Sequence, residues 1–244
     1  DTGLSRLKIA DAGDVPKRLS LQEAHTRLEE SVASALKAGA IPFVVGGGND
    51  QSYPNASALL GRASGETGVV NIDAHLDVRP LKQGKAHSGS PFRLLLEDPR
   101  FSGKNFLEFA AQGSQCSREH ADYIYGREGH ILWLQEAAPG GGTTGKTFKR
   151  SLDRLAERCS SIFVSFDLDS IAACHAPGVS CPGVLGLSAE DAVAIARHAG
   201  AHPAVALFDL SEYNPLIEEE LTGRLAAAIF YYFCLGVASR KEGK

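Results

Sequence analysis

The sequence predicts an α/β fold in which a mostly parallel sheet is covered by helices on both faces. Two observations support this prediction: short apolar runs alternate with helical segments along the chain, and polar residues follow several of the apolar runs. In such sheets, ligands bind beyond the carboxyl ends of the strands. The chain has 244 residues, 43% of them hydrophobic, so it can bury a sizeable core. No linker or change of composition interrupts it, and we therefore expect a single domain over residues 1–244.

The individual elements are predicted from local signals. Ser20 and Glu23 form a capping-box pattern, which satisfies backbone donors at a helix start, and Gly39 ends that helix. Ser188 precedes another helix in the same way. We expect strands at residues 6–10, 41–45, 68–72, 105–111, 130–134, 161–167 and 204–210. We expect helices at residues 20–37, 53–60, 92–96, 119–125, 146–158, from 188 onward and at 218–235.

The most informative stretch follows the apolar run Gly68–Val70 and carries three metal-capable side chains, Asp73, His75 and Asp77, at every second residue. In extended backbone, alternate residues point to one side, so these three can converge on a point just past the strand. The plain alternative is an acidic, solvated turn that contains a histidine. We prefer a metal site because a second stretch repeats the pattern.

The second stretch is the apolar run 161–167, which ends in carboxylates two residues apart, Asp167 and Asp169. Carboxylates and one imidazole, without sulfur, favour a hard or borderline ion such as Mn²⁺ over structural zinc. A single divalent ion would leave excess negative charge in such a site. We therefore expect two ions bridged by shared carboxylates.

Charge and composition exclude several classes of partner. The net charge is −4 and no basic stripe is present, which argues against nucleic acid. We expect no membrane span, because no apolar run looks long enough, and no signal peptide at the start. The five cysteines are odd in number and lack Cys-x-x-Cys spacing, so we expect free thiols in a reducing compartment, the cytoplasm.

A competing motif lies at residues 140–147, Gly-Gly-Gly-Thr-Thr-Gly-Lys-Thr, which fits the phosphate-loop pattern between a predicted strand and a predicted helix. Asp167 could then be the magnesium-binding aspartate of a P-loop NTPase. That hypothesis leaves Asp73, His75 and Asp77 unexplained. The glycines are equally typical of a flexible surface loop.

Five segments together resemble the ureohydrolase family, which comprises arginase, agmatinase and formimidoylglutamase. They are residues 46–50 (Gly-Gly-Gly-Asn-Asp), 71–77, 88–92, 165–169 and 209–215. The resemblance implies a three-layer α/β/α fold, two manganese ions and a homo-oligomer, a trimer or hexamer. Within the family, the runs Asp77-Val78-Arg79-Pro80 and Ser88 to Arg93 are similar to formimidoylglutamase, which hydrolyses N-formimidoyl-L-glutamate to glutamate and formamide.

The resemblance also implies roles for individual residues. Asp73 and Asp167 would bridge both ions, with Asn49 and Asp77 completing the first ion and His75 and Asp169 the second. Asp77 would also shuttle a proton, and Glu212 would bind the cationic amidine.

Four positions concern substrate choice and departures from the family pattern. Arg79, two residues after Asp77, would bind a substrate carboxylate, and Arg93 is a second candidate. Asn49 stands where most members have a metal-binding histidine, and Ser88 stands where arginases have a catalytic histidine. A guanidino hydrolase of the arginase or agmatinase type, or a metal-poor non-catalytic relative, remain alternatives.

Overall fold

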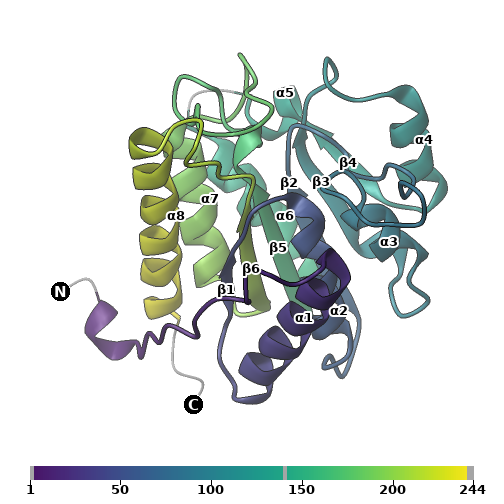
Figure 1. The fold of residues 1–244 in the computed structure, drawn as a ribbon. Helices are drawn as coiled ribbons and strands as arrows, with labels where there is room; N and C mark the ends of the chain where they lie inside the picture. The colour runs from purple at the N-terminus through teal and green to yellow at the C-terminus, as the bar shows by residue number, and fades with distance from the viewer. Residues whose placement is uncertain (1–2, 140–141, 241–244) are drawn as a thin grey trace.

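A computed structural model describes residues 3–139 and 142–240, and it contains a six-stranded sheet in the order β1-β6-β5-β2-β3-β4 (Figure 1). Every neighbouring pair of strands is parallel, so all carboxyl ends lie at one edge of the sheet. The strands are β1 (Phe43–Val45), β2 (Thr67–Ile72), β3 (Phe106–Ala111), β4 (His130–Trp133), β5 (Ser161–Asp167) and β6 (Val205–Ser211). The prediction of a mostly parallel sheet is confirmed.

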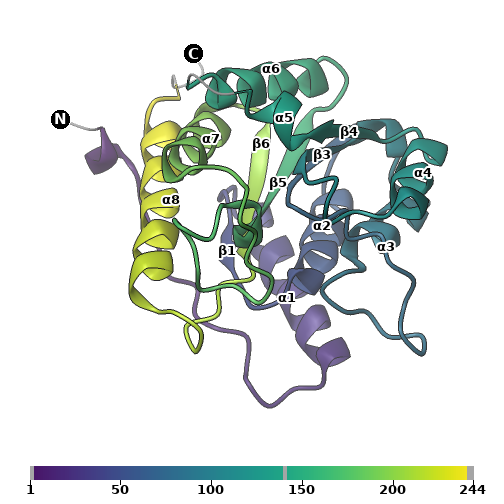
Figure 2. The ribbon, with the colours of Figure 1, turned by 90° about the horizontal axis from the view of Figure 1, so that it is seen from above.

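Helices cover both faces of this sheet, as the view from above shows (Figure 2). On one side lie α5 (Leu134–Ala137), α6 (Thr144–Ala156), α7 (Ala189–Ala201) and α8 (Glu220–Ala238). On the other side lie α1 (Leu21–Lys37), α2 (Ser52–Leu60), α3 (Pro91–Glu97) and α4 (Arg118–Gly126). Short 3-10 turns are η1 (Leu4–Arg6), η2 (Asn49–Gln51), η3 (Gly103–Asn105) and η4 (Leu168–Ser170).

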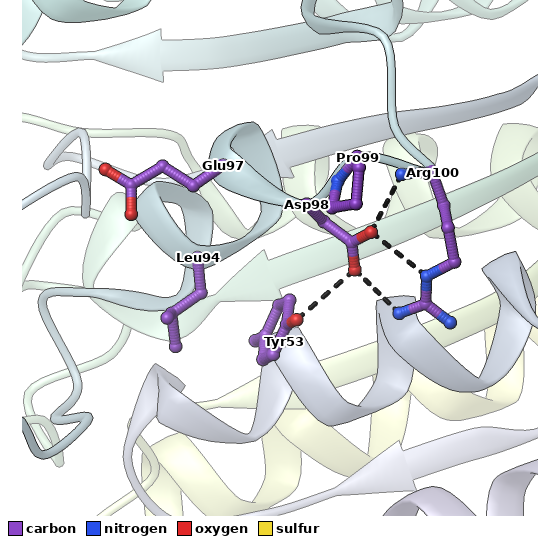
Figure 3. A pocket seen from close by; sticks show the side chains of 6 residues that line it. All are labelled: Tyr53, Leu94, Glu97, Asp98, Pro99 and Arg100. Carbon is purple, nitrogen blue, oxygen red and sulfur yellow. Dashed lines mark hydrogen bonds and ion pairs between the residues drawn. The ribbon is translucent and has the colours of Figure 1, made fainter.

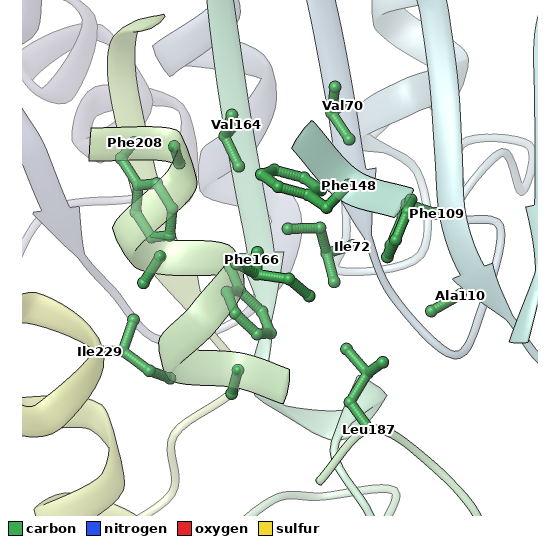
Figure 4. Packing of buried hydrophobic residues seen from close by; sticks show 14 of the residues in the cluster. Val70, Ile72, Phe109, Ala110, Phe148, Val164, Phe166, Leu187, Phe208 and Ile229 are labelled. Carbon is green, nitrogen blue, oxygen red and sulfur yellow. The ribbon is translucent and has the colours of Figure 1, made fainter. Parts of the chain in front are cut away.

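The alternation of side chains along each strand divides the apolar core into two parts. Ile72, Phe166 and Phe208 point to the α6–α8 side, where Phe148 of α6 also packs (Figure 4). Other strand residues, among them Val69, point to the side of α1–α4. The sheet is therefore buried on both faces, and irregular loops carry the polar residues at its carboxyl edge.

Most predicted elements are present within a few residues of their expected bounds. The capping box of α1 forms as predicted, with Glu23 N bonded to Ser20 Oγ at 3.4 Å and Ser20 N to Glu23 Oε2 at 2.8 Å. The predicted strand at 6–10 is wrong: residues 7–16 have no regular structure, and Ile9 is 61% exposed. Alternation of apolar residues in five positions is insufficient where no neighbouring strand is available for pairing.

Helix α8 corrects the expectation that no apolar stretch reaches the length of a membrane span. Its 19 residues satisfy that criterion by length and composition alone. However, Leu225, Ile229 and Phe233 lie in the same apolar core as α7 and the sheet. This is the packing of a core helix, with one face buried and the other outward.

Candidate metal centre

The first group of predicted ligands follows β2 directly. Regular strand ends at Ile72, the chain then bends, and Asp77 takes a left-handed conformation with φ 45°. Asp73 is fully buried, and His75 is 15% exposed in its side chain. The sequence predicts that Asp73, His75 and Asp77 converge because alternate residues of extended backbone point to one side. That reason is wrong, because the chain bends after Ile72 and the bend brings these side chains together.

The second group follows β5, the central neighbour of β2 in the sheet. Asp167 ends the strand, and its Oδ1 accepts a hydrogen bond from Asp169 N at 2.9 Å. This hydrogen bond caps the 3-10 turn η4, and Asp169 lies within that turn. Both carboxylates are buried, and Oδ1 of Asp169 has no hydrogen-bond partner among residues 3–139 and 142–240. A buried carboxylate oxygen without a protein partner is suited to binding a cation.

The two groups combine into two overlapping sets of possible ligands. Atoms of Asp73, Asp77 and Asp167, here called the first cluster, lie within 4.8 Å of one another. Atoms of Asp73, His75 and Asp169, the second cluster, meet the same limit. Either set has the oxygen-rich composition that suits Mn²⁺ or a similar ion.

Asp73 belongs to both clusters and turns one oxygen toward each. Its Oδ1 accepts from His75 N at 2.7 Å and lies 3.3 Å from His75 Nδ1. Its Oδ2 lies 3.5 Å from Asn49 Nδ2, on the side of Asp77. A carboxylate oriented in this way can bridge two ions.

The electrostatics of the clusters require positive charge. Burial raises the pKa of Asp77 and Asp167 well above the usual range, and the neighbouring carboxylates add to the effect. Burial alone would lower the pKa of His75, but hydrogen bonds to Asp169 and Asp73 outweigh it and raise the pKa to about 11. A positive charge on His75 is therefore favoured beside Asp73 and Asp169.

Asn49 approaches the first cluster from η2, which follows the glycine turn after β1. Its Nδ2 donates to Asp77 Oδ2 at 3.0 Å, and its Oδ1 accepts from Ser52 Oγ at 2.7 Å and Ser211 Oγ at 3.2 Å. The amide thus presents its nitrogen to the carboxylates and its oxygen to two hydroxyls. Asn49 thus lies beside the first cluster with its amide nitrogen, and not its oxygen, turned toward the carboxylates.

Glu212 and Ser88 lie together beside this turn. Glu212, with φ 64°, accepts from Asn49 N at 3.0 Å through Oε1. A Cβ added to Gly48 would lie 3.3 Å from Ser88 Cβ and 3.4 Å from Glu212 Oε1, so glycine allows both to approach. The neighbouring His87 is turned into its own loop, with Nε2 3.1 Å from Pro80 O.

The two predicted substrate-binding arginines differ in their surroundings. Arg79 is exposed and, among the described residues, its guanidinium has no ion pair or hydrogen bond. Arg93 is engaged elsewhere: its Nε lies 3.1 Å from Glu97 Oε1, and its guanidinium stacks 4.4 Å from the Tyr123 ring centroid. The structure therefore leaves Arg79 free for a ligand and commits Arg93 to α3 and α4.

Several buried polar residues near the centre were not predicted. Glu108 of β3 contacts Asn71, and Asp209 of β6 accepts from Ser52 Oγ at 2.9 Å. The half-buried His25 of α1 has its Nε2 2.6 Å from Asp50 Oδ2. A signal existed for two of them, since Glu108 and Asp209 are charges inside otherwise apolar strands.

A surface depression between α2 and α3 lies apart from these residues (Figure 3). At its centre, Asp98 accepts hydrogen bonds from Tyr53 Oη at 3.2 Å and Arg100 Nη2 at 2.6 Å. Both carboxylate oxygens of Asp98 are thus already used, since Arg100 Nε donates to the other at 3.0 Å. None of the predicted site residues lines this depression.

The model of the arginase family matches residues 1–236. The chain belongs to the arginase family. A formimidoylglutamase of Geobacillus thermodenitrificans is 33% identical to it over 235 residues, which make up 95% of this chain and 70% of that protein. A second formimidoylglutamase, from Aeromonas hydrophila, is 31% identical over 230 residues, 91% of this chain and 72% of that protein.

Solved structures of this arginase family agree with the fold. A formiminoglutamase of Trypanosoma cruzi with Mn²⁺ matches at a TM-score of 0.90 and 47% identity, covering 98% of this chain and 78% of that one. The formimidoylglutamase of Bacillus subtilis, at 23% identity and a TM-score of 0.87, covers 95% of this chain and 73% of that one, and supports the fold alone. The three-layer α/β/α prediction and the resemblance to formimidoylglutamases are confirmed.

The P-loop hypothesis is wrong, since the arginase family accounts for the chain. Gly140 and Gly141 of that motif lie outside the described residues. In the remainder, α5 separates β4 from the motif, and two strands, β3 and β2, separate β4 from β5 in the sheet. Asp167 is therefore far from where a phosphate loop after β4 would need its magnesium ligand.

Proposed function

We propose that this protein hydrolyses a linear amidine, N-formimidoyl-L-glutamate, with water to L-glutamate and formamide. One observation carries the proposal: two overlapping clusters of ligand atoms share Asp73, and the carboxylate of Glu212 lies beside them, bonded to Asn49 N. Arg79, two residues after Asp77 in the chain, is exposed and has no ion pair among the described residues. The similarity to formiminoglutamases, including one solved with Mn²⁺, supports it. A cationic amidine joined to a dicarboxylate is the substrate that such a combination of charges fits.

We propose that the clusters hold two Mn²⁺ ions. Asp73 and Asp167 would bridge the ions, Asn49 and Asp77 would complete the first, and His75 and Asp169 the second. When bound, two such ions lower the pKa of a shared water toward neutrality and supply hydroxide for attack on the amidine carbon.

The chain's own residues would orient the substrate and move protons. Asp77 would carry a proton from the attacking water to the leaving nitrogen of glutamate, after which the C–N bond breaks. Glu212 uses Oε1 to accept from Asn49 N, so Oε2 is left for the amidinium N–H groups.

Recognition of the substrate carboxylates would fall to Arg79, because a guanidinium can bind a carboxylate through paired hydrogen bonds. Ser88 would border the same space with a small side chain. Arg93 is a weaker candidate because Glu97 and Tyr123 occupy its guanidinium.

The test is turnover of formimidoylglutamate by purified protein with added Mn²⁺, followed by formamide and glutamate release. Arginine, agmatine and guanidinobutyrate, which carry a guanidino group, are assayed in parallel as alternative substrates. Preference for one of these three would replace the proposal with a guanidino hydrolase. Absence of turnover on all four, with no bound metal, would favour the non-catalytic alternative.

Two expectations about the cell remain predictions. The five cysteines are all unpaired thiols in the structure, as a reducing compartment such as the cytoplasm would allow. A homo-oligomer, trimer or hexamer, is what the family resemblance implies.

A further inference from the structure

Two polar residues lie inside the apolar strands that support the metal centre. Asn71 of β2 and Glu108 of β3 are paired in the parallel register, and both are fully buried. Asn71 is two residues after Val69 in the same strand, so its side chain points to the α1–α4 side of the sheet, as that of Val69 does. Asp73 follows just beyond the end of the strand, and its Oδ2 lies 3.3 Å from Asn71 Nδ2. The pair therefore lies directly beneath the carboxylate shared by the two clusters.

Asn71 connects Glu108 to Asp73 through one amide group. Its Nδ2 lies 3.2 Å and 3.1 Å from Glu108 Oε1 and Oε2, and 3.3 Å from Asp73 Oδ2. An amide nitrogen has two hydrogens, so one can serve Glu108 while the other serves Asp73. Glu108 thus fixes the plane in which Asn71 directs a donor at Asp73.

Burying such a pair is costly unless its hydrogen bonds are made. Within the described part of the chain, Oδ1 of Asn71 is buried without a hydrogen-bond partner, so Asn71 depends on the bonds of its Nδ2. Burial, followed by the charge of Asp73, raises the pKa of Glu108 well above its usual range, and the hydrogen bond from Asn71 opposes this shift.

The contact acts on one oxygen of Asp73 only. Oδ2 faces the first cluster, whereas Oδ1 is held independently by His75 N at 2.7 Å. Loss of the Asn71 donor would therefore allow the Oδ2 side of the carboxylate to turn away. The second cluster would keep its own backbone contact.

We propose that Asn71 and Glu108 are positioning residues that hold Asp73 Oδ2 toward the first cluster and thereby set the affinity of the first metal ion but not of the second. The inference rests on the proposed two-ion centre. Neither Asn71 nor Glu108 is among the proposed metal ligands, so this role is additional to that of the ligands.

The test is titration of metal-free full-length protein with Mn²⁺ alone, with free Mn²⁺ measured by electron paramagnetic resonance. The double variant Asn71→Leu/Glu108→Leu replaces both partners with apolar groups of similar size, which preserves folding better than removing one. We expect its looser ion to bind at least about tenfold more weakly, with the tighter ion changed by less than about threefold. Glu108→Gln, which can still pair with the Asn71 amide, should retain both affinities within about threefold.

A matched control lies at the other end of the same sheet. Asn105 is a buried asparagine that donates to Glu66 Oε2 at 2.6 Å, far from the carboxyl ends of the strands. Asn105→Ala should cost stability but leave both Mn²⁺ affinities unchanged. If the double variant does not fold, as judged by circular dichroism, Asn71→Ser supplies the same readout, because its hydroxyl is too short to span both partners.

Three results would overturn the inference. Unchanged affinities in the double variant, or equal weakening of both ions, would mean that the pair has only a structural role while the two-ion centre stands. Failure of the unaltered protein to bind Mn²⁺ would instead overturn the proposed centre and this inference together.

Discussion

The side-chain amide of Asn49 donates to Asp77 Oδ2 across 3.0 Å, so the first cluster meets a hydrogen-bond donor where an ion needs an oxygen. Ser52 and Ser211 hold Oδ1 of Asn49 on the opposite side. For Asn49 to ligate an ion, its amide must turn over and both hydroxyl bonds must rearrange. This cost falls on the first ion and not on the second.

We therefore expect protein isolated without added Mn²⁺ to contain fewer than two ions per chain. Asn49→His should increase the affinity of the first ion, because imidazole is a better ligand for such ions than an amide oxygen. The substitution also removes the amide hydrogen bonds that would have to rearrange before an ion binds. Calorimetry showing two equally tight sites in the unaltered protein would contradict this account.

Mn²⁺ affinity should rise with pH. In the absence of metal the pKa of His75 is raised to about 11 and that of Asp169 to about 7, so ligand formation must displace protons. Each proton released changes the affinity by about tenfold per pH unit. Asp169 contributes a released proton only below about pH 7, so the Mn²⁺ affinity should depend more steeply on pH there.

This prediction is checked by Mn²⁺ titration between pH 6 and pH 8.5, and by calorimetry in buffers of different ionisation enthalpy, which counts the protons. An affinity that does not change over this range would show that the ligands are already deprotonated before the ion binds.

Arg79→Ala should lower kcat/KM for formimidoylglutamate by at least about tenfold, roughly 1.4 kcal/mol, through loss of a charged pairing with the substrate. Agmatine has no carboxylate, so whatever turnover it supports should not fall. Arg93→Ala is the matched control, since Arg93 already pairs with Glu97. Equal losses on both substrates would remove the carboxylate-binding role of Arg79.

Gly48→Ala should raise KM for the substrate without changing bound Mn²⁺. The added Cβ would lie 2.8 Å from Asp50 Oδ1 and at tight distances from Ser88 and Glu212. Glu212 is the proposed partner of the amidinium, so its displacement weakens substrate binding. Gly47→Ala is the control because its Cβ would meet nothing within 4 Å. A similar change of KM in both variants would mean that the conformation of the glycine turn, and not the displacement of Glu212, causes the effect.

The sequence predicts the parallel sheet and the collection of ligands at one edge because both follow from local patterns. Alternating strands and helices require crossovers, and polar residues after apolar runs then share the carboxyl edge. The bend after Ile72 and the left-handed Asp77 do not follow from alternation, so the mode of convergence was not predictable.

The orientation of Asn49 depends on residues far along the chain. Ser211 is 162 positions from Asn49, and only the folded sheet brings its hydroxyl to Oδ1. Glu108 was accessible in principle, as a charge within the apolar run of β3. Its partner Asn71 becomes identifiable only once the register of β2 and β3 is known.

The central claim is a two-ion manganese centre that hydrolyses formimidoylglutamate, and Asp167 tests it most directly because it belongs to the first cluster and caps the turn that presents Asp169 of the second. The measurement is formamide release from formimidoylglutamate by the unaltered protein and by Asp167→Ala, each stripped with chelator and then supplied with Mn²⁺. We predict that Mn²⁺ restores turnover to the unaltered protein alone and that Asp167→Ala retains neither metal nor activity. Turnover by metal-stripped protein with chelator present would contradict the account.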